Sequence, residues 1–263
     1  MKVRGEGGGT SMTLKQRTRT QTRKDQELAL PPPFRLVKLG EAGDAFGHAC
    51  ANAAELGAGA LVFTGRFGVA EFAVVLETDD RLTAARRTFC AGMVALYDAI
   101  ASLAPPQKLI AIEWPDAIRV DGALVGGGRL AWPTGTDEYA APEWLVFGVS
   151  IRTATVSKNV PDGDSPTTTL EAQGFDDPRP ERVVEKFARH LLAADDRLQE
   201  TGFAAVAKAY VSRLARQRGV RHDIAENGDL VTSQRDGPAE RRALVPMLAM
   251  PRWVDAQCGG LHV

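Results

Sequence analysis

The segment from Ile112 to Gly128 constrains the fold more than any other part of this 263-residue chain. It contains a short apolar strand, a Trp-Pro corner, a hairpin around Asp121-Gly122 and three consecutive glycines at 126–128. The Asp-Gly pair supplies the positive φ angles of a tight hairpin turn. Glycines inside a strand pack no side chain, so they indicate a close approach of another backbone or of a ligand. A glycine bulge beside a core tryptophan explains the same residues equally well.

The rest of the chain alternates between helical and strand patterns. The clearest helix is expected over residues 81–103, where apolar residues recur at steps of three and four until Pro105-Pro106. Further helices are expected over 45–56, 179–198 and 202–216, and strands over 34–38, 60–63, 69–77, 109–112, 118–120 and 144–152. Asp44 and Gly57 suit the two ends of the first helix. Helices interleaved with strands and hairpins predict an α+β fold with a mixed sheet and packed helices, not a doubly wound parallel sheet.

Three parts of the chain differ in composition. Residues 1–30 form a basic leader: up to residue 29 it has seven basic side chains against three acidic ones, a balance of +4. We expect it to be disordered, and a solvated leader is favoured over a nucleic-acid arm. Residues 31–217 form the main domain. Residues 218–263 form a small C-terminal appendage with a β-hairpin around Asn227-Gly228.

Charge and cysteine content narrow the range of functions. A net charge of -1 gives no general attraction to nucleic acid or to an anionic membrane, and no apolar run approaches the roughly 20 residues that span a bilayer. The three cysteines show neither a disulfide framework nor metal spacing, which favours a reducing cytoplasm. Cys50 and Cys90 fall in helical patterns, and both are expected to lie in the core. The four histidines lack metal-ligand spacing.

The glycine-containing segment resembles the signature of the biotin/lipoate–protein ligase family. In that family Lys-Trp-Pro-Asn-Asp precedes a hairpin and Lys-Leu-Ala-Gly-Ile. Trp114, Pro115, Leu124 and Gly126 match, and Asp116 stands where the family has asparagine. Other pieces that resemble the family follow in its order over roughly residues 34–215: Gly65-Arg66, Phe67-Gly68, residues 148–152, residues 169–171 and two helices ending near Tyr210.

The resemblance implies a biotin/lipoate ligase-like catalytic core and its reaction. Such enzymes adenylate a biotin- or lipoate-like carboxylic acid with ATP and Mg²⁺, and then transfer it to a lysine of a biotinyl or lipoyl carrier domain. It also implies site residues, although no catalytic residue is assigned. Gly65, Arg66 and the backbone of Gly126, Gly127 and Gly128 would meet the adenylate phosphate, Trp114 and Pro115 would line the pocket, Asp116 would hold Mg²⁺ or the acid's polar head, and Arg152 would replace a missing cation.

The chain also departs from the family pattern at charged positions. Glu113 and Ala123 stand where the family has lysines, and Arg66 is all that is left of an arginine-rich loop. Asp44-Ala45-Phe46 replaces Ser-Thr-Asn, and Arg152 replaces an asparagine. Each lost charge-assisted contact costs about 1.5–3 kcal/mol. The alternative to a divergent ligase is therefore a degenerate, non-catalytic relative that binds a different ligand or a partner protein.

Overall fold

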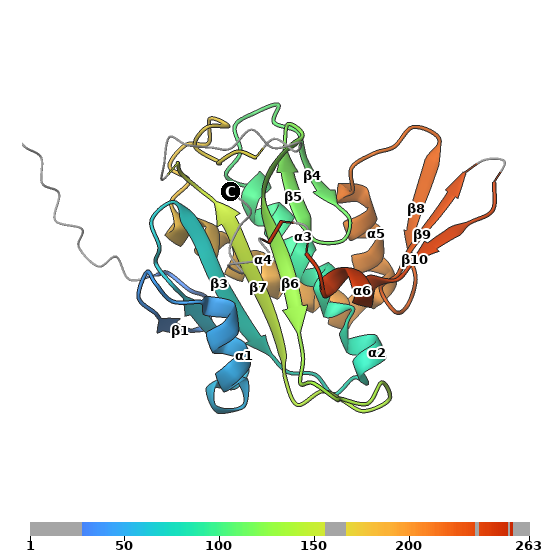
Figure 1. Cartoon of the computed structure of the whole chain (residues 1–263), viewed down its shortest axis with the longest axis horizontal. Coiled ribbons are helices and arrows are strands. Elements are labelled where there is room, and N and C mark those ends of the chain that lie inside the picture. Colours follow the sequence, from blue (N-terminus) through green and yellow to red (C-terminus); the bar gives the residue numbers. More distant parts are fainter. Residues whose placement is uncertain (1–27, 156–166, 235–236, 252, 255–263) are drawn as a thin grey trace, which may run out of the picture.

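A seven-stranded mixed sheet forms the centre of the molecule in the computed structural model, which describes residues 28–155, 167–234, 237–251 and 253–254 (Figure 1). Its strands lie in the order β1-β2-β3-β7-β6-β5-β4. They are β1 (Arg35–Lys38), β2 (Ala60–Phe63), β3 (Val69–Leu76), β4 (Ile110–Glu113), β5 (Ala117–Val120), β6 (Ala123–Ala131) and β7 (Leu145–Arg152). The β1–β2 pairing is parallel and the other described pairings in this sheet are antiparallel, which confirms the predicted mixed sheet.

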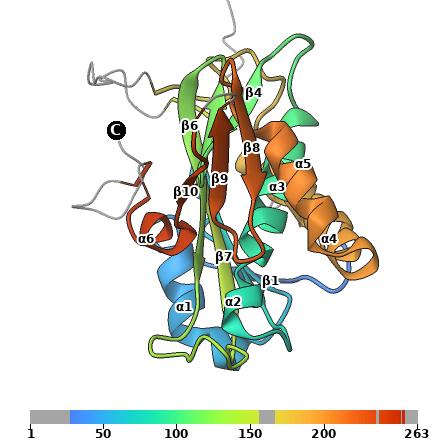
Figure 2. The same ribbon diagram turned by 90° about the vertical axis from the view of Figure 1, so that its right-hand side faces the viewer.

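Helices cover the two faces of this sheet unequally (Figure 2). Helix α1 (Ala45–Leu56) lies on one face, whereas α3 (Thr88–Ala101), α4 (Pro180–Thr201) and α5 (Phe203–Arg213) lie on the other. Successive side chains of β7 point to opposite faces of the sheet, so this strand contributes to the core on both faces. Phe147, Val149 and Ile151 enter the main core with α3 and α4, and Val146 joins the smaller cluster under α1.

The C-terminal appendage adds a second sheet of three antiparallel strands. It consists of β8 (Val220–Ile224), β9 (Leu230–Gln234) and β10 (Glu240–Arg242), followed by the short helix α6 (Leu244–Leu248). Ile224, Leu230, Leu244 and Leu248 belong to the main core cluster, so the appendage packs directly on the larger sheet and its helices.

Local sequence signals located most elements to within a few residues. The Asp44 side chain caps α1 by accepting from the backbone N–H of Gly47, and Gly57 ends that helix with φ 69°. Asp121 and Gly122 have the positive φ angles expected of the hairpin. The helix predicted over residues 81–103 is wrong in one respect, because it divides into α2 (Leu82–Ala85) and α3.

The break between α2 and α3 coincides with two arginines that hold different partners. Arg86 pairs with Glu138 and lies over the Trp132 ring, whereas Arg87 pairs with Glu226 and lies over Phe203. Cys90 is buried as expected, and Cys50 is half-buried and packs against the smaller core cluster under α1. Residues 1–27 of the leader and Cys258 lie outside the described residues. None of the helices in the described part of the chain is long and apolar enough to cross a membrane.

Candidate functional site

One row of residues crosses the sheet on the side where α1 lies. The strand register places Ser150 of β7 opposite Glu71 of β3 and opposite Gly127 of β6, and Gly127 opposite Ala117 of β5. Directly opposed residues project to the same side of a sheet. Arg152 follows Ser150 by two residues and therefore projects to this side as well. We call the part of this side formed by Ala117, Leu124, Gly127, Ser150 and Arg152 the glycine face.

The three predicted glycines are close to the chain's own atoms. Gly126 has φ +141°, and a Cβ there would lie 2.0 Å from the carbonyl oxygen of Ser150. A Cβ at Gly127 would lie 2.1 Å from the carbonyl oxygen of Asp116 and 2.5 Å from Nε1 of Trp253. A Cβ at Gly128 would strike core side chains on the opposite side. The glycine run is thus explained by close strand packing and by the indole of Trp253.

The Trp-Pro corner is buried. Trp114 belongs to the main core, and the guanidinium of Arg242 lies 5.4 Å from its ring centre. The hydroxyl of Tyr210 donates to the carbonyl oxygen of Pro115, and burial raises the pKa of Tyr210 well above its usual value. Asp116 is only 2% exposed, and its carbonyl oxygen accepts from the N–H of Gly128 at 2.9 Å. This corner therefore fixes β4, β5, β6 and α5 to one another.

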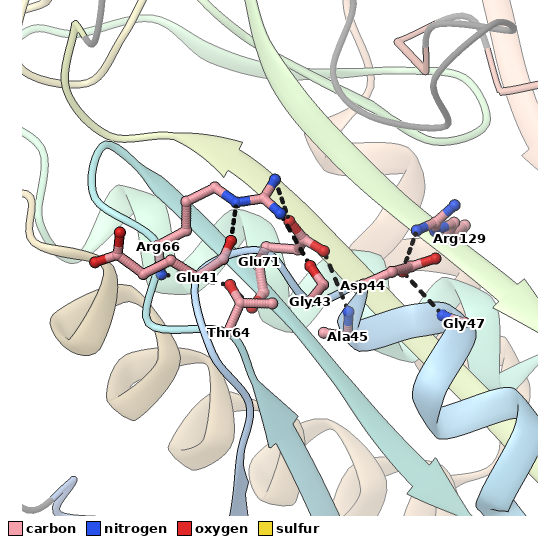
Figure 3. A network of polar contacts seen from close by, with 9 residues as sticks. All are labelled: Glu41, Gly43, Asp44, Ala45, Gly47, Thr64, Arg66, Glu71 and Arg129. Carbon is pink, nitrogen blue, oxygen red and sulfur yellow. Dashed lines mark hydrogen bonds and ion pairs between the residues drawn. The ribbon is translucent and has the colours of Figure 1, made fainter.

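Arg66 is held by partners from strand β3 and from the loop between β1 and α1 (Figure 3). Its Nη1 lies 2.9 Å from Oε2 of Glu71, and it donates to the carbonyl oxygens of Glu41 and Gly43 at 2.8 and 2.9 Å. The other carboxylate oxygen of Glu71 accepts from the N–H of Ala45 at the start of α1. The residue that the family resemblance assigns to a phosphate thus binds the protein's own carboxylate here.

Arg129 lies at the other side of the same helix start. Its Nη2 is 3.7 Å from Oδ1 of Asp44, and its guanidinium lies 3.9 Å from the ring centre of Phe46. Burial lowers the pKa of Arg129, while Asp44 and Glu71 act in the opposite direction. Backbone N–H groups at a helix N-terminus favour an anion. At α1 the chain supplies this anion itself, as two carboxylates that are each paired with an arginine (Figure 3).

Arg152 differs from these two arginines. Its two terminal nitrogen atoms are buried, and they have no hydrogen-bond partner in the part of the chain that the structure describes. Burial lowers the pKa of its guanidinium. The fully buried hydroxyl of the neighbouring Thr153 also has no hydrogen-bond partner there. A buried cation without a counter-ion is energetically costly, so Arg152 is the candidate to bind an anion from outside the chain.

The residue assigned to Mg²⁺, and the residue that stands where the family has its first lysine, fit the implied ATP site less well. Across residues 28–155, 167–234, 237–251 and 253–254, no three His, Cys, Asp or Glu side chains gather as metal ligands do. Mg²⁺ commonly uses one or two carboxylates together with substrate phosphates, so a single carboxylate such as that of Asp116 could still serve as its protein ligand. Glu113, in place of the first lysine, pairs with Arg119. The cations that the family resemblance implies for ATP binding are therefore only partly present in this chain.

Two residues of this region, Glu71 and Trp253, were not predicted from the sequence. Glu71 is the lone charged residue in the otherwise apolar strand β3, which was an available signal. Trp253 lies in a Pro- and Gly-punctuated end and had no comparable signal.

The Gly65 backbone has φ 67° and begins the turn that carries Arg66.

Comparison with known proteins agrees with this architecture. The family model described as "Biotin/lipoate A/B protein ligase family" matches residues 30–212. A biotin–[acetyl-CoA-carboxylase] ligase of Paracoccus denitrificans is 26% identical over 176 residues, which are 62% of this chain and 71% of that protein. A biotin protein ligase-like protein of unknown function from Silicibacter superposes with a TM-score of 0.71 at 25% identity, covering 84% of this chain and 98% of the other.

The biotin protein ligase of Aquifex aeolicus, solved in complex with biotin and ATP, shares the fold. Its TM-score is 0.59 at 13% identity, with 79% of this chain and 95% of that chain covered. The family match spans well over half of the sequence, from the entry into β1 to the end of α5. This chain belongs to the biotin/lipoate A/B protein ligase family, as a divergent member with a ligase-like catalytic fold.

Proposed function

We propose that this protein adenylates a biotin- or lipoate-like carboxylic acid with ATP and transfers it to a lysine of a biotinyl or lipoyl carrier domain in the cytoplasm. The observation that carries the proposal is the buried guanidinium of Arg152, which lacks a hydrogen-bond partner among the described residues. Support comes from membership of the family and from a relative that was solved with biotin and ATP.

Arg152 suits an acid activation because the two reacting anions meet at one point. In the first step a carboxylate oxygen forms a bond to the α-phosphorus, the α–β phosphoanhydride bond breaks, and pyrophosphate leaves. In the second step the lysine amine attacks the carbonyl carbon, loses a proton, and AMP leaves. A fixed guanidinium can bind the carboxylate in a bidentate manner and reduce its repulsion from the phosphate.

The other proposed site residues have defined tasks. The turn at Gly65 and Arg66 would approach the adenylate phosphate, and Arg66 would have to exchange Glu71 for that phosphate. The backbone of Gly126, Gly127 and Gly128 would form the floor, Trp114 and Pro115 would hold that floor in place, and Asp116 would bind Mg²⁺ or the acid's polar head. Mg²⁺ would supply additional positive charge for the phosphates.

A second candidate function is supported by the pairing of Arg66. Because Glu71, Glu41 and Gly43 already bind this guanidinium, and because Glu113 replaces a lysine, the chain would bind an organic acid at Arg152 without adenylating it. This reading makes the protein a non-catalytic member that senses or presents a ligand, or that binds a partner protein through the same face.

Calorimetry and pyrophosphate release distinguish these functions. We expect at least one of biotin, lipoate and octanoate to bind the wild-type chain, alone or with ATP. Arg152→Ala should weaken that binding about 10- to 100-fold, which corresponds to one charge-assisted contact. Arg197→Ala, on an exposed position of α4 on the opposite side of the sheet, is the matched control and should bind as wild type does.

Each outcome has a separate meaning. Release of pyrophosphate with one of these acids supports the ligase reaction, whereas acid binding without pyrophosphate release supports the second candidate. If neither the wild-type chain nor a variant that lacks Trp253 binds any of the acids, with or without ATP, then the ligase reaction and acid binding at Arg152 are both wrong. If Arg152→Ala binds the acid as tightly as Arg197→Ala does, Arg152 is not the anion site.

A further inference from the structure

The indole of Trp253 lies on the glycine face. Trp253 is 1% exposed and forms a small cluster with Ala117 and Leu124, with the partly buried Val254 beside it. Its Nε1 lies so close to Gly127 that a Cβ there would be 2.5 Å away. In Figures 1 and 2 the coloured part of the chain just after α6 lies on the side of the sheet where α1 lies. A side chain of the protein thus covers the glycine run that the family resemblance assigns to the ligand.

The attachment of this segment is incomplete. Within the described ranges the buried Nε1–H of Trp253 has no hydrogen-bond acceptor, so part of the gain from burying the ring is offset. Two backbone hydrogen bonds are described for the segment: the N–H of Met250 donates to the carbonyl oxygen of Met247, and the N–H of Val254 donates to that of Pro251. The largest apolar contact described for the segment is therefore the Trp253 ring, which lies against a surface with few side chains.

The preceding part of the appendage is anchored independently. Leu244 and Leu248 of α6 are in the main core, and the N–H of Leu244 donates to Oδ1 of Asp229 at 2.9 Å. Asp229 also binds Arg241 and Asn227. Trp253 and Val254 can consequently leave the glycine face while α6 and the three-stranded sheet stay in place.

The indole and an acid of the proposed class have matching shapes. Both present a flat or extended apolar body with few polar atoms. Arg152 lies two residues beyond Ser150 on β7, and therefore about 7 Å along the strand from the row that contains Gly127. An acid whose carboxylate binds Arg152 would place its apolar body over Gly127 and Ala117, where the indole now lies.

We propose that Trp253 is the protein's own occupant of the acid-binding face, so that an acid binds only after the Trp253 side chain has been displaced. This inference rests on the proposed function, because it takes the glycine face as the acid site. The C-terminal segment then acts as a self-inhibitory plug, and its release, by a partner or by a high acid concentration, sets the apparent affinity.

Calorimetric titration of three full-length proteins tests this proposal. Wild type, Trp253→Ala and the control Met250→Ala, whose side chain is 78% exposed in the same segment, are titrated with biotin, lipoate and octanoate. We expect Trp253→Ala to bind at least one acid 10-fold or more tightly than wild type, and Met250→Ala to match wild type. A chain ending at Ala249 should reproduce the gain, and this second variant decides the question if Trp253→Ala does not fold.

The possible results separate the plug from the proposed function. If wild type binds an acid and neither variant lacking Trp253 binds it more tightly, the plug is refuted and the acid site stands. Weaker binding by Trp253→Ala and by the shortened chain would make the indole a wall of the site, which also overturns the proposal. If none of the proteins binds any acid, the plug and the acid site are both wrong.

Discussion

Arg66 and Arg152 lie on the same side of the sheet in very different surroundings. Arg66 matches the family's phosphate loop, yet it is held by Glu71 and two carbonyl oxygens. Arg152 stands where the family has asparagine, yet its buried nitrogen atoms lack a hydrogen-bond partner among the described residues. In a divergent site, therefore, the partners of a cation, rather than its match to a motif, indicate which cation remains available to a ligand.

The largest expected effect follows from removing the carboxylate that holds Arg66. Glu71→Gln leaves the Arg66 guanidinium without its counter-ion and weakens the acceptor for the N–H of Ala45. We expect the free energy of unfolding in urea to fall by about 2–3 kcal/mol, as for other charge-assisted contacts. Glu77→Gln is the control, because Glu77 is exposed and accepts a single bond from Ala58. A loss no greater than that of the control would show that Arg66 is not held by Glu71 in solution.

Removing Arg152, the arginine without a hydrogen-bond partner among the described residues, should raise the free energy of unfolding instead of lowering it. Arg152→Met keeps most of the side-chain length and removes a buried charge, so the free energy of unfolding should rise by about 1 kcal/mol while acid binding is lost. Arg129→Met, which removes a paired arginine, should lower the free energy of unfolding. Urea unfolding of both variants measures the difference. A loss of stability in Arg152→Met would mean that this guanidinium supports the fold and is not reserved for a ligand.

The sequence predicted those parts of the fold that depend on local signals. The Asp44 cap and the Asp121-Gly122 turn act within a few residues, and both occur as expected. The break between α2 and α3 was not predictable in this way, because Arg86 and Arg87 bind residues 52 and 139 positions away. Strand β10 and helix α6 likewise depend on packing against the appendage and the core, and no periodicity marked them.

The strands that carry the candidate site residues were predictable, but the contacts of those residues were not. The order of the pieces from Gly65 to Arg152 singled out the glycines, Arg66 and Arg152. Whether an arginine is paired depends on the register of neighbouring strands, because β3 and β7 bring Glu71 opposite Ser150. The position of Trp253 depends on how the appendage packs, more than 120 residues along the chain from Gly127. Local sequence patterns contain neither piece of information.

The smallest expected effect is on the reaction rate of the Cys50 thiol, because the pKa of this thiol depends in part on Arg129. Burial raises the pKa of the Cys50 thiol to about 11, while Arg129 lowers it and Asp44 raises it; burial raises the pKa of Cys90 to about 12. A higher thiol pKa means less thiolate at a given pH, so at pH 8 both thiols should react with a disulfide reagent at least 10-fold more slowly than in urea. The experiment uses a Cys258→Ser background, in which Cys50 and Cys90 are the remaining thiols. Arg129→Met should slow Cys50 further by about 2-fold, whereas Arg152→Met should leave its rate unchanged. Equal effects of the two substitutions would remove the distinction between the paired and the unpaired arginine.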